Sequence, residues 1–239
     1  MAERFRGKVA FIAGGTGGLG RAVSLAFLEE SARVIVTYRT RSEFDSLVQD
    51  AGLHGAALTG LQLDVTDEAS TLRAIAQLAA DAGRIDILVN AVGGYAGGTD
   101  LWSTPPEVFE RMIALNLRSG FSLCRAVVPI MLRQGSGWIV NVASRAAFDH
   151  AAGASAYAST KAAAIAMMDS LAADLRGKGV RVNSVVPSII DTPANRRDMP
   201  NANFAQWPKP EDIAKVILFL ASEDARLIHG ASIPVYGDT

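Results

Sequence analysis

The stretch KVAFIAGGTGGLGRA, residues 8–22, joins an apolar run to a glycine-rich turn and then to a helical pattern. Its first part, 8–13, is typical of a strand buried on both faces. Gly14, Gly18 and Gly20 follow with the spacing G-x-x-x-G-x-G, and a helix is expected over about 18–30. Such a turn lets the backbone approach a pyrophosphate, with N–H donors at the helix N-terminus. The stretch predicts a nucleotide-binding strand–helix unit, and an ordinary tight turn is the alternative.

The same alternation continues along the chain. Continuously apolar runs predict further strands over 33–38, 58–64, 85–90, 137–144, 180–186 and 231–235. Helical patterns lie between them, at about 42–51, 67–82, 105–134 (two helices), 155–177 and 210–221. Strand–helix alternation with right-handed crossovers produces a doubly wound parallel sheet. We therefore expect an α/β, Rossmann-type fold of about seven strands, in three layers with helices on both faces, and a single domain over 1–239.

The composition narrows the classes of partner. The chain has 239 residues, 49% of them hydrophobic, and a net charge of −1, which gives no sign of a nucleic-acid or membrane-surface partner. No apolar run approaches the roughly 18–20 residues of a membrane span. Cys124 is the single cysteine, so we expect no intrachain disulfide and a reducing, cytoplasmic setting. His54, His150 and His229 are scattered, and no metal site is predicted.

The end of the second predicted strand bears on the choice of dinucleotide. An acidic residue there would bind the ribose 2′-hydroxyl of NAD, and an arginine would meet the 2′-phosphate of NADP. The chain reads TYRTRSE, with Tyr38 where an acidic residue would stand and Arg39 and Arg41 close behind. Two guanidinium groups suit a dianionic phosphate, so NADP(H) is favoured over NAD(H). The alternative is that these arginines are solvated loop charges.

The next two strands end in residues suited to line a ligand crevice. LDVTD places Asp64 where it can bind an adenine amino group, with Val65 against the ring. NAVGG places Asn90 and Ala91 at the end of the fourth strand. Open α/β sheets bind ligands at these carboxyl ends.

Tyr157 and Lys161, in SAYASTK, are four residues apart on a predicted helix and share one face. A neighbouring ammonium favours the phenolate, so Lys161 is expected to lower the pKa of Tyr157 from its usual value near ~10. The pair then forms a proton-transfer device. The alternative is a packed tyrosine and a solvated lysine.

These features resemble the classical short-chain dehydrogenase/reductase family over essentially the whole chain. The glycine turn matches that family's T-G-x-x-x-G-x-G, with Ala13 in place of threonine. LDVTD matches its adenine-site segment, and NAVGG is similar to its N-N/x-A-G motif with Val92 added before Gly93. The family's four catalytic positions match, in order, Asn116, Ser144, Tyr157 and Lys161. Singly, Ser144 could cap the following loop and Asn116 could bridge helices.

The resemblance implies hydride transfer between NADP(H) and a carbonyl or secondary alcohol, as in 3-oxoacyl-acyl-carrier-protein reductases or general ketone reductases. Tyr157 would act as acid in reduction and base in oxidation, and Lys161 would also contact the nicotinamide ribose. Ser144 would donate to the substrate oxygen, and the Asn116 amide would hold a water chain leading to Lys161. The residues expected to contact the cofactor are Gly14, Thr16, Gly17, Gly18, Leu19, Gly20, Tyr38, Arg39, Asp64, Val65, Asn90, Ala91, Tyr157, Lys161, Pro187, Ile190 and Thr192.

The walls of the substrate pocket carry no motif of their own. Candidate wall residues are Tyr95, Arg145, Phe148, His150, Ser188 and Trp207, and residues 187–210 are expected to form a lid. The lid stretch 191–210 is similar to that of quinonoid dihydropteridine reductases, although those enzymes usually prefer NADH and lack the serine of strand five. A dihydropteridine-type reductase is therefore one alternative, and a non-catalytic NADP(H)-sensing regulatory protein is another. The family resemblance also implies a small-molecule substrate and a homotetramer or homodimer.

Overall fold

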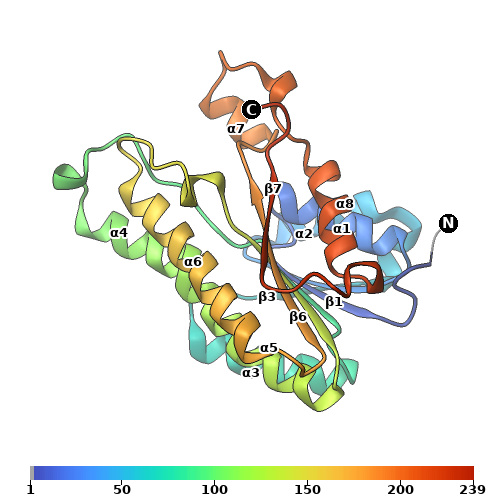
Figure 1. Ribbon diagram of the computed structural model, residues 1–239. Helices are drawn as coiled ribbons and strands as arrows, with labels where there is room; N and C mark the ends of the chain where they lie inside the picture. Colours follow the sequence, from blue (N-terminus) through green and yellow to red (C-terminus); the bar gives the residue numbers. More distant parts are fainter. Residues whose placement is uncertain (1–2) are drawn as a thin grey trace.

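The chain folds around one parallel sheet of seven strands, in the order β3-β2-β1-β4-β5-β6-β7 (Figure 1). The structure is a computed structural model that describes residues 3–239. The strands are β1 (Val9–Ala13), β2 (Arg33–Tyr38), β3 (Leu58–Gln62), β4 (Ile87–Asn90), β5 (Gly137–Val142), β6 (Val180–Pro187) and β7 (Ala231–Val235). The strand order reverses between β1 and β4, which confirms the doubly wound topology and places a switch point beside the glycine turn.

Helices cover both faces of the sheet, and the seven main ones correspond closely to the predicted ranges. They are α1 (Gly18–Glu29), α2 (Arg41–Ala51), α3 (Glu68–Ala82), α4 (Pro106–Ile113), α5 (Ser119–Gln134), α6 (Ser155–Asp174) and α8 (Pro210–Leu220). Side chains of α1, α2 and α8 pack in one apolar core, and those of α3, α5 and α6 pack in the other. Figure 1 shows α1 and α8 on one side of the sheet and α5 and α6 on the other.

Strand β1 shows why the apolar runs are continuous. Ala10 and Ile12 point into the core beneath α1 and α8, whereas Val9, Phe11 and Ala13 point into the core beneath α3 and α5. All five side chains are buried, because both faces of the strand are covered. A polar residue in such a strand would lose its hydration on either face, so the sequence does not alternate.

The region 105–134 differs from the prediction of two separate helices. Helices α4 and α5 are joined without a break by a π-helical turn, η3 (Ala114–Arg118). Single π turns inside α-helices are often found at functional sites, and this one carries the buried Asn116. By length and composition alone, Pro106–Gln134 could cross a membrane; its buried side chains, Leu123 and Val127 among them, pack against the sheet as in a core helix.

The predicted lid, 187–210, is partly helical. It contains α7 (Pro193–Asp198) and a 3₁₀ turn, η5 (Phe204–Gln206), and the amide of Asp191 donates to the carbonyl of Pro208 across its base. The segment after β7 runs alongside α7 (Figure 1). Ser188 Oγ donates to the Tyr236 carbonyl over 2.7 Å, and the Asp238 amide donates to the Gln206 carbonyl over 3.1 Å. Both ends of the lid are thus tied to the C-terminal segment.

A row of polar side chains crosses the middle of the sheet. Asn90, Asn141, Ser184 and Ser232 are register partners on β4, β5, β6 and β7, and they share the face beneath α5 and α6. Asn90 Nδ2 donates to Asn141 Oδ1 over 3.0 Å. Asn141 Nδ2, Ser184 Oγ and Ser232 Oγ are buried and have no protein partner within residues 3–239. Buried polar atoms usually pair with protein groups or with ordered water, so this row is a polar layer inside an otherwise apolar core.

Candidate active site

The glycine turn between β1 and α1 leaves the start of the helix open. Gly14 has φ +75°, and its amide donates to Thr37 Oγ1 over 2.8 Å. A Cβ placed at Gly20 would lie 2.1 Å from the Gly14 carbonyl oxygen, so only glycine fits there. The N-cap residue of α1 is Gly17, which has no side chain to occupy the first amides of the helix. Those amides and the helix dipole are available to an anion such as a pyrophosphate.

A cavity of about 180 Å³ opens at the carboxyl ends of β1, β2, β3 and β4. Its lining residues are Gly14, Thr16, Gly17, Thr37, Tyr38, Arg39, Glu43, Leu63, Asp64, Val65, Thr66, Ala91, Val92, Gly93 and Leu115. The structure therefore brings together eight residues expected to contact the cofactor, namely Gly14, Thr16, Gly17, Tyr38, Arg39, Asp64, Val65 and Ala91.

Other predicted cofactor residues lie around the cavity but do not line it. They are Gly18, Leu19, Gly20, Asn90, Tyr157, Lys161, Pro187, Ile190 and Thr192. Leu19 is buried in the core under α1, and the side-chain amide of Asn90 donates a hydrogen bond to Asn141 Oδ1. A Cβ placed at Gly18 would lie 2.8 Å from Thr192 Cγ2, so the start of the lid rests directly on the glycine turn.

The two arginines after β2 have different environments. Arg39 lines the cavity, whereas Arg41 does not. Arg41 Nε donates to Asp45 over 2.8 Å, and its guanidinium lies 5.7 Å from the centroid of the Phe44 ring. Of the two guanidinium groups expected to meet a 2′-phosphate, the structure presents one to the cavity.

Tyr38 and Asp64 frame the same end of the cavity. The ring of Tyr38 is buried and stacks on Phe44, with 4.9 Å between centroids and 14° between planes. Asp64 accepts hydrogen bonds from the Thr66 hydroxyl over 2.7 Å and the Thr66 amide over 2.9 Å. These bonds lower the pKa of Asp64, which keeps it a carboxylate able to accept from a ligand amine.

Helix α6 begins at Ser155 and places Tyr157 and Lys161 on one face, one turn apart. Lys161 is buried, and its Nζ donates to the Val142 carbonyl over 3.1 Å. Burial lowers the pKa of Lys161 to about 8, because the charged ammonium loses hydration. Its Nζ lies 6.0 Å from the centroid of the Tyr157 ring.

The pKa of Tyr157 differs from the expected direction. Burial raises the pKa of its phenol, the Ser144 hydroxyl partly offsets the rise, and the neighbouring Tyr95 adds to it. Burial and Tyr95 outweigh the lowering expected from Lys161, whose amine donates to the Val142 carbonyl. In this structure the phenol therefore retains its proton at neutral pH, which suits a proton donor.

Ser144 lies just beyond β5 and begins the 3₁₀ turn η4 (Arg145–Ala147). Its Oγ accepts from the Ala146 amide over 3.2 Å, so the serine caps this turn. Because an oxygen that accepts a bond can still donate one, the same hydroxyl can also donate to the Tyr157 oxygen, which lowers the pKa of that phenol. Capping and donation to a substrate oxygen are compatible roles for Ser144.

Asn116 is held by the loop after β4. Its Oδ1 accepts from the Gly94 amide over 2.9 Å, and its Nδ2 donates to the Gly94 carbonyl over 3.0 Å and to Thr160 Oγ1 over 3.2 Å. Both N–H groups of the amide have protein partners. The side chain thus fixes the loop against α6, and its amide has no free donor for the predicted water chain.

Gly93 connects the catalytic side chains to the cavity. A Cβ placed at Gly93 would lie 3.0 Å from Asn116 Oδ1 and 3.2 Å from Lys161 Nζ. Gly93 itself lines the cavity. The lysine amine and the asparagine amide therefore converge where the cavity meets α6.

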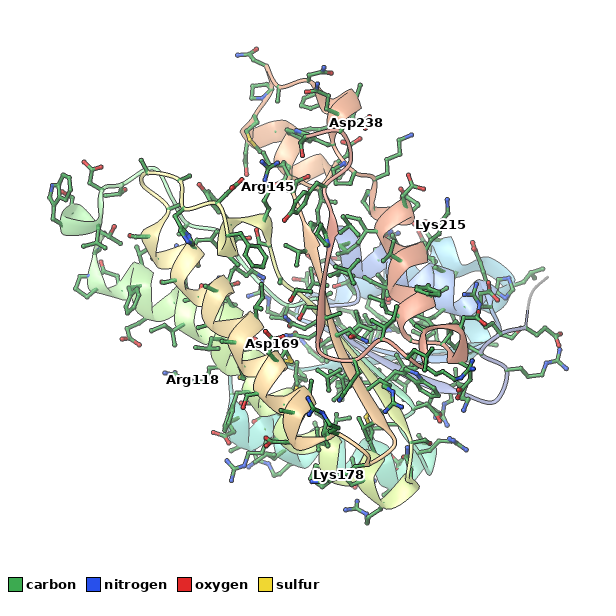
Figure 2. All side chains as sticks on the ribbon, in the orientation of Figure 1. Arg118, Arg145, Asp169, Lys178, Lys215 and Asp238 are labelled. Atoms are coloured by element: carbon green, nitrogen blue, oxygen red, sulfur yellow. The ribbon has the colours of Figure 1, made fainter. Side chains whose placement is uncertain are left out.

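The predicted substrate walls are only partly brought together. Tyr95 is 68% exposed and meets Tyr157 edge-on, with 5.0 Å between ring centroids. Phe148 and His150 are exposed in the loop before α6. Arg145 Nε donates to Asp149 over 2.5 Å, and its guanidinium lies 5.1 Å from the Tyr236 ring, next to the C-terminal segment (Figure 2).

Two wall candidates belong to the base of the lid. Ser188 donates to the Tyr236 carbonyl, as described above. Trp207 is only 7% exposed, contacts Phe204, and lines a second cavity of about 340 Å³ with residues of α8 and the C-terminal segment. None of Asn116, Ser144, Tyr157 and Lys161 lines that second cavity.

Some residues of the site were not predicted from the sequence. Glu43, Thr37 and Leu115 line the first cavity, and Tyr236 covers Arg145. Glu43 was detectable, because it follows directly on TYRTRS at the start of a predicted helix. Tyr236 carried no comparable signal, since its contact depends on how the last strand meets the loop after β5. Among residues 3–239, no group of three or more His, Cys, Asp or Glu side chains could hold a metal ion.

Curated relatives match almost the entire chain. The chain is 35% identical to 3-oxoacyl-[acyl-carrier-protein] reductase FabG of Thermotoga maritima, over 98% of both chains. It is 36% identical to 2-(R)-hydroxypropyl-CoM dehydrogenase of Xanthobacter autotrophicus, over 96% of this chain and 97% of the relative.

Solved structures agree with the fold over the same length. A short-chain dehydrogenase/reductase structure from Burkholderia xenovorans has a TM-score of 0.92 and 36% identity, covering 99% and 97% of the two chains. ElxO with NADP bound has a TM-score of 0.91 and 28% identity, covering 96% and 97%. NAD⁺-bound xylitol dehydrogenase has a TM-score of 0.91 and 25% identity, covering 98% and 99%.

The family profile described as short chain dehydrogenase matches residues 8–203. That range contains the glycine turn, the cavity and all four predicted catalytic positions. With the relatives and the fold, it confirms the resemblance seen in the sequence: this chain belongs to the short-chain dehydrogenase/reductase family of oxidoreductases.

Proposed function

We propose that this protein is an NADP(H)-dependent reductase that delivers hydride to a ketone and, in reverse, oxidises a secondary alcohol. The observation that carries the proposal is that Lys161 Nζ lies beside Gly93, which lines the first cavity, while Tyr157, one helical turn before Lys161, interacts with the Ser144 hydroxyl. A protonated phenol, a buried amine and a serine hydroxyl are the groups that carbonyl reduction requires.

The residues present fit a nicotinamide dinucleotide. The open N-terminus of α1 suits the pyrophosphate, and Asp64 and Val65 suit an adenine ring. When bound, the dinucleotide supplies the hydride, and the protein supplies orientation and a proton. Lys161, with its pKa lowered to about 8, is positioned to donate to a ribose hydroxyl near Gly93.

The proton in the reductive direction comes from Tyr157. Burial raises the pKa of this phenol, so it is protonated at neutral pH and can donate as negative charge develops on the substrate oxygen. Ser144 donates a second hydrogen bond to that oxygen when its hydroxyl turns from the phenol to the substrate. Tyr157→Phe should lower the rate of ketone reduction about 10²- to 10⁴-fold and leave NADPH affinity within about twofold. Full activity in this variant would remove the mechanism.

The preference for NADP(H) rests on Arg39. Its guanidinium lines the cavity at the end of β2, where a 2′-phosphate would lie, and Arg41 is engaged elsewhere. Similar structures include one with NADP bound and one with NAD⁺ bound, so family membership alone does not decide between the two cofactors.

Titration with NADPH and NADH tests the preference for NADP(H), with Arg41→Ala as the matched control. Arg39→Ala should weaken NADPH at least about tenfold and NADH little. Tighter NADH binding by the wild type would contradict the assignment.

The substrate class is proposed from relatives that act on small carbonyl or hydroxyl compounds. We expect turnover of simple ketones or 3-oxoacyl thioesters, in line with the 3-oxoacyl reductase at 35% identity. A dihydropteridine-type activity is the second candidate, since the lid sequence 191–210 is similar to that of pteridine reductases. Trp207, on which part of this similarity rests, is buried and lines a cavity with residues of α8 and the C-terminal segment, and Ser144 favours an ordinary ketone.

One panel separates these candidates. NADPH oxidation is measured with ketones, 3-oxoacyl thioesters and quinonoid pterins at equal concentrations. A pterin rate well above every ketone rate would favour the second candidate. A third possibility is a nucleotide-sensing protein without catalysis. It requires that the protein binds NADPH, turns over no compound of the panel, and binds NADPH with the same affinity in Tyr157→Phe.

We also propose a cytoplasmic enzyme that works as a homo-oligomer, a tetramer or a dimer, without nucleic-acid or membrane partners. Cys124 is buried, and burial raises the pKa of its thiol to about 12, so it is unreactive.

The oligomer has a candidate contact surface on α4 and α5. Phe109 on α4 and Phe121 and Leu132 on α5 are more than 40% exposed, and a second copy of the chain could cover these side chains. Light scattering after size exclusion measures the oligomeric state, and a monomer at micromolar concentration would contradict the oligomer.

A further inference from the structure

Glu43 reaches from α2 back to the glycine turn. It lies in the first turn of α2 and lines the first cavity. The hydroxyl of Thr16, which also lines the cavity, donates to Glu43 Oε2 over 3.2 Å. A carboxylate thus bridges the glycine turn and α2 at the end of the cavity that Arg39 occupies.

The charges at this end of the cavity do not balance. The charged lining consists of Arg39, Glu43 and Asp64, one positive group and two negative groups. Within residues 3–239, Arg39 has no carboxylate within 4.0 Å to form an ion pair. A site built only for a dianionic phosphate would not place a second carboxylate there, because like charges repel at short range.

We propose that Glu43 is a specificity-determining residue that weakens binding of the 2′-phosphate. The ratio of the affinities for NADPH and NADH is then smaller than Arg39 alone would make it. The proposal rests on the cofactor site described above. Glu43 acts in two ways: its charge opposes the phosphate dianion, and it occupies the Thr16 hydroxyl, which could otherwise donate to phosphate. The adenosine ribose of NADH has no 2′-phosphate, and its hydroxyls can donate to a carboxylate, so Glu43 does not oppose binding of NADH.

The competing explanation is that Glu43 only stabilises its helix. Acidic residues in the first turn interact favourably with the helix dipole. Glu107 is a matched control, since it is also a glutamate in the first turn of a helix, α4, and it lies outside the cavity. A purely structural role predicts that Glu43→Gln and Glu107→Gln behave alike.

The test measures binding of two ligands that differ only in the 2′-phosphate, adenosine 2′,5′-bisphosphate and adenosine 5′-monophosphate. Isothermal titration with the full chain gives Kd for each, and no turnover is needed. Glu43→Gln should tighten the bisphosphate about 5- to 20-fold and change the monophosphate less than about twofold. Glu107→Gln should change neither. Glu43→Ala also frees the Thr16 hydroxyl, so adding Thr16→Val to Glu43→Ala should remove part of the gain seen in Glu43→Ala.

The outcomes are distinguishable from failure of the proposed function. If both ligands bind and Glu43→Gln leaves their ratio unchanged, or tightens both equally, the role assigned to Glu43 is wrong and the cofactor site stands. If neither ligand binds to the wild type, the cofactor site itself is wrong. Thermal unfolding of each variant confirms that the folded protein is being titrated.

Discussion

The side chain of Asn116 and the backbone of Gly94 exchange two hydrogen bonds, of 2.9 and 3.0 Å. One residue belongs to the π-helical turn between α4 and α5, and the other to the loop that follows β4. This exchange holds the loop containing Gly93 against Lys161, and it gives Asn116 a positioning role that does not depend on bound water.

Replacing Asn116 should therefore affect folding as well as rate. Asn116→Ala leaves the Gly94 amide and carbonyl without their partner and removes one of the hydrogen bonds of the Thr160 hydroxyl, at a cost of about 1–3 kcal/mol in the free energy of unfolding. Urea unfolding measures this loss, and Asn201→Ala, at an exposed lid position, is the control. Wild-type stability in Asn116→Ala would show that the exchange contributes nothing to the fold.

Lys161 should make stability depend on pH. Burial lowers the pKa of this lysine from 10.5 to about 8, so between those values the unfolded chain holds more protons than the folded one. The free energy of unfolding of the wild type should then rise with pH through this window, relative to Lys161→Met, by up to about 3 kcal/mol. Urea unfolding from pH 7 to 10.5 tests this, with the exposed Lys178→Met as control. A constant difference between wild type and Lys161→Met contradicts a desolvated amine.

Ser144 should control the basic limb of the pH–rate profile. Its hydroxyl opposes the rise that burial causes in the pKa of Tyr157. In Ser144→Ala the pKa of the phenol should move further upward, so ketone reduction, which needs the phenolic proton, should persist to higher pH. The plateau rate should fall about 10- to 10³-fold through loss of a donor to the substrate oxygen. The profile of kcat/KM is measured beside Ser159→Ala, a serine on the helix of Tyr157 whose hydroxyl donates to the Ala156 carbonyl. A basic limb displaced to lower pH would refute the assignment.

Trp207 should matter for stability rather than for substrate choice. Its indole is 7% exposed and contacts Phe204, so Trp207→Ala should lower the free energy of unfolding by about 3 kcal/mol. Trp102, which is 83% exposed, is the control and should change stability by less than about 0.5 kcal/mol. The ratio of rates on two ketones of different size should be the same in Trp207→Phe and in wild type. A change in that ratio would return Trp207 to the substrate pocket.

The sequence predicted what depends on local pattern. The glycine turn, the strands buried on both faces and the spacing of Tyr157 and Lys161 are each encoded within a few residues, and the structure has them at or near the predicted positions. The fold class follows from these patterns, because few topologies accommodate alternating strands and helices.

What the sequence could not supply depends on direction and distance between remote segments. Arg39 and Arg41 are equivalent in the sequence, yet one faces the cavity and the other lies over Phe44. The expected lowering of the Tyr157 pKa failed because helical spacing fixes a shared face but not where a long side chain ends. Trp207 was assigned to the cleft because aromatics in a lid are often ligand contacts, and its burial depends on α8 and the C-terminal segment.

A more stable enzyme could be made by substitutions in the polar row of Asn90, Asn141, Ser184 and Ser232. Ser184 and Ser232 have no protein partner within the described chain, so exchanging them for alanine or valine would remove two buried hydroxyls without touching the reacting groups. An engineer who wanted tolerance to heat or organic co-solvent could begin in the middle of the sheet and leave the chemistry at its edge alone.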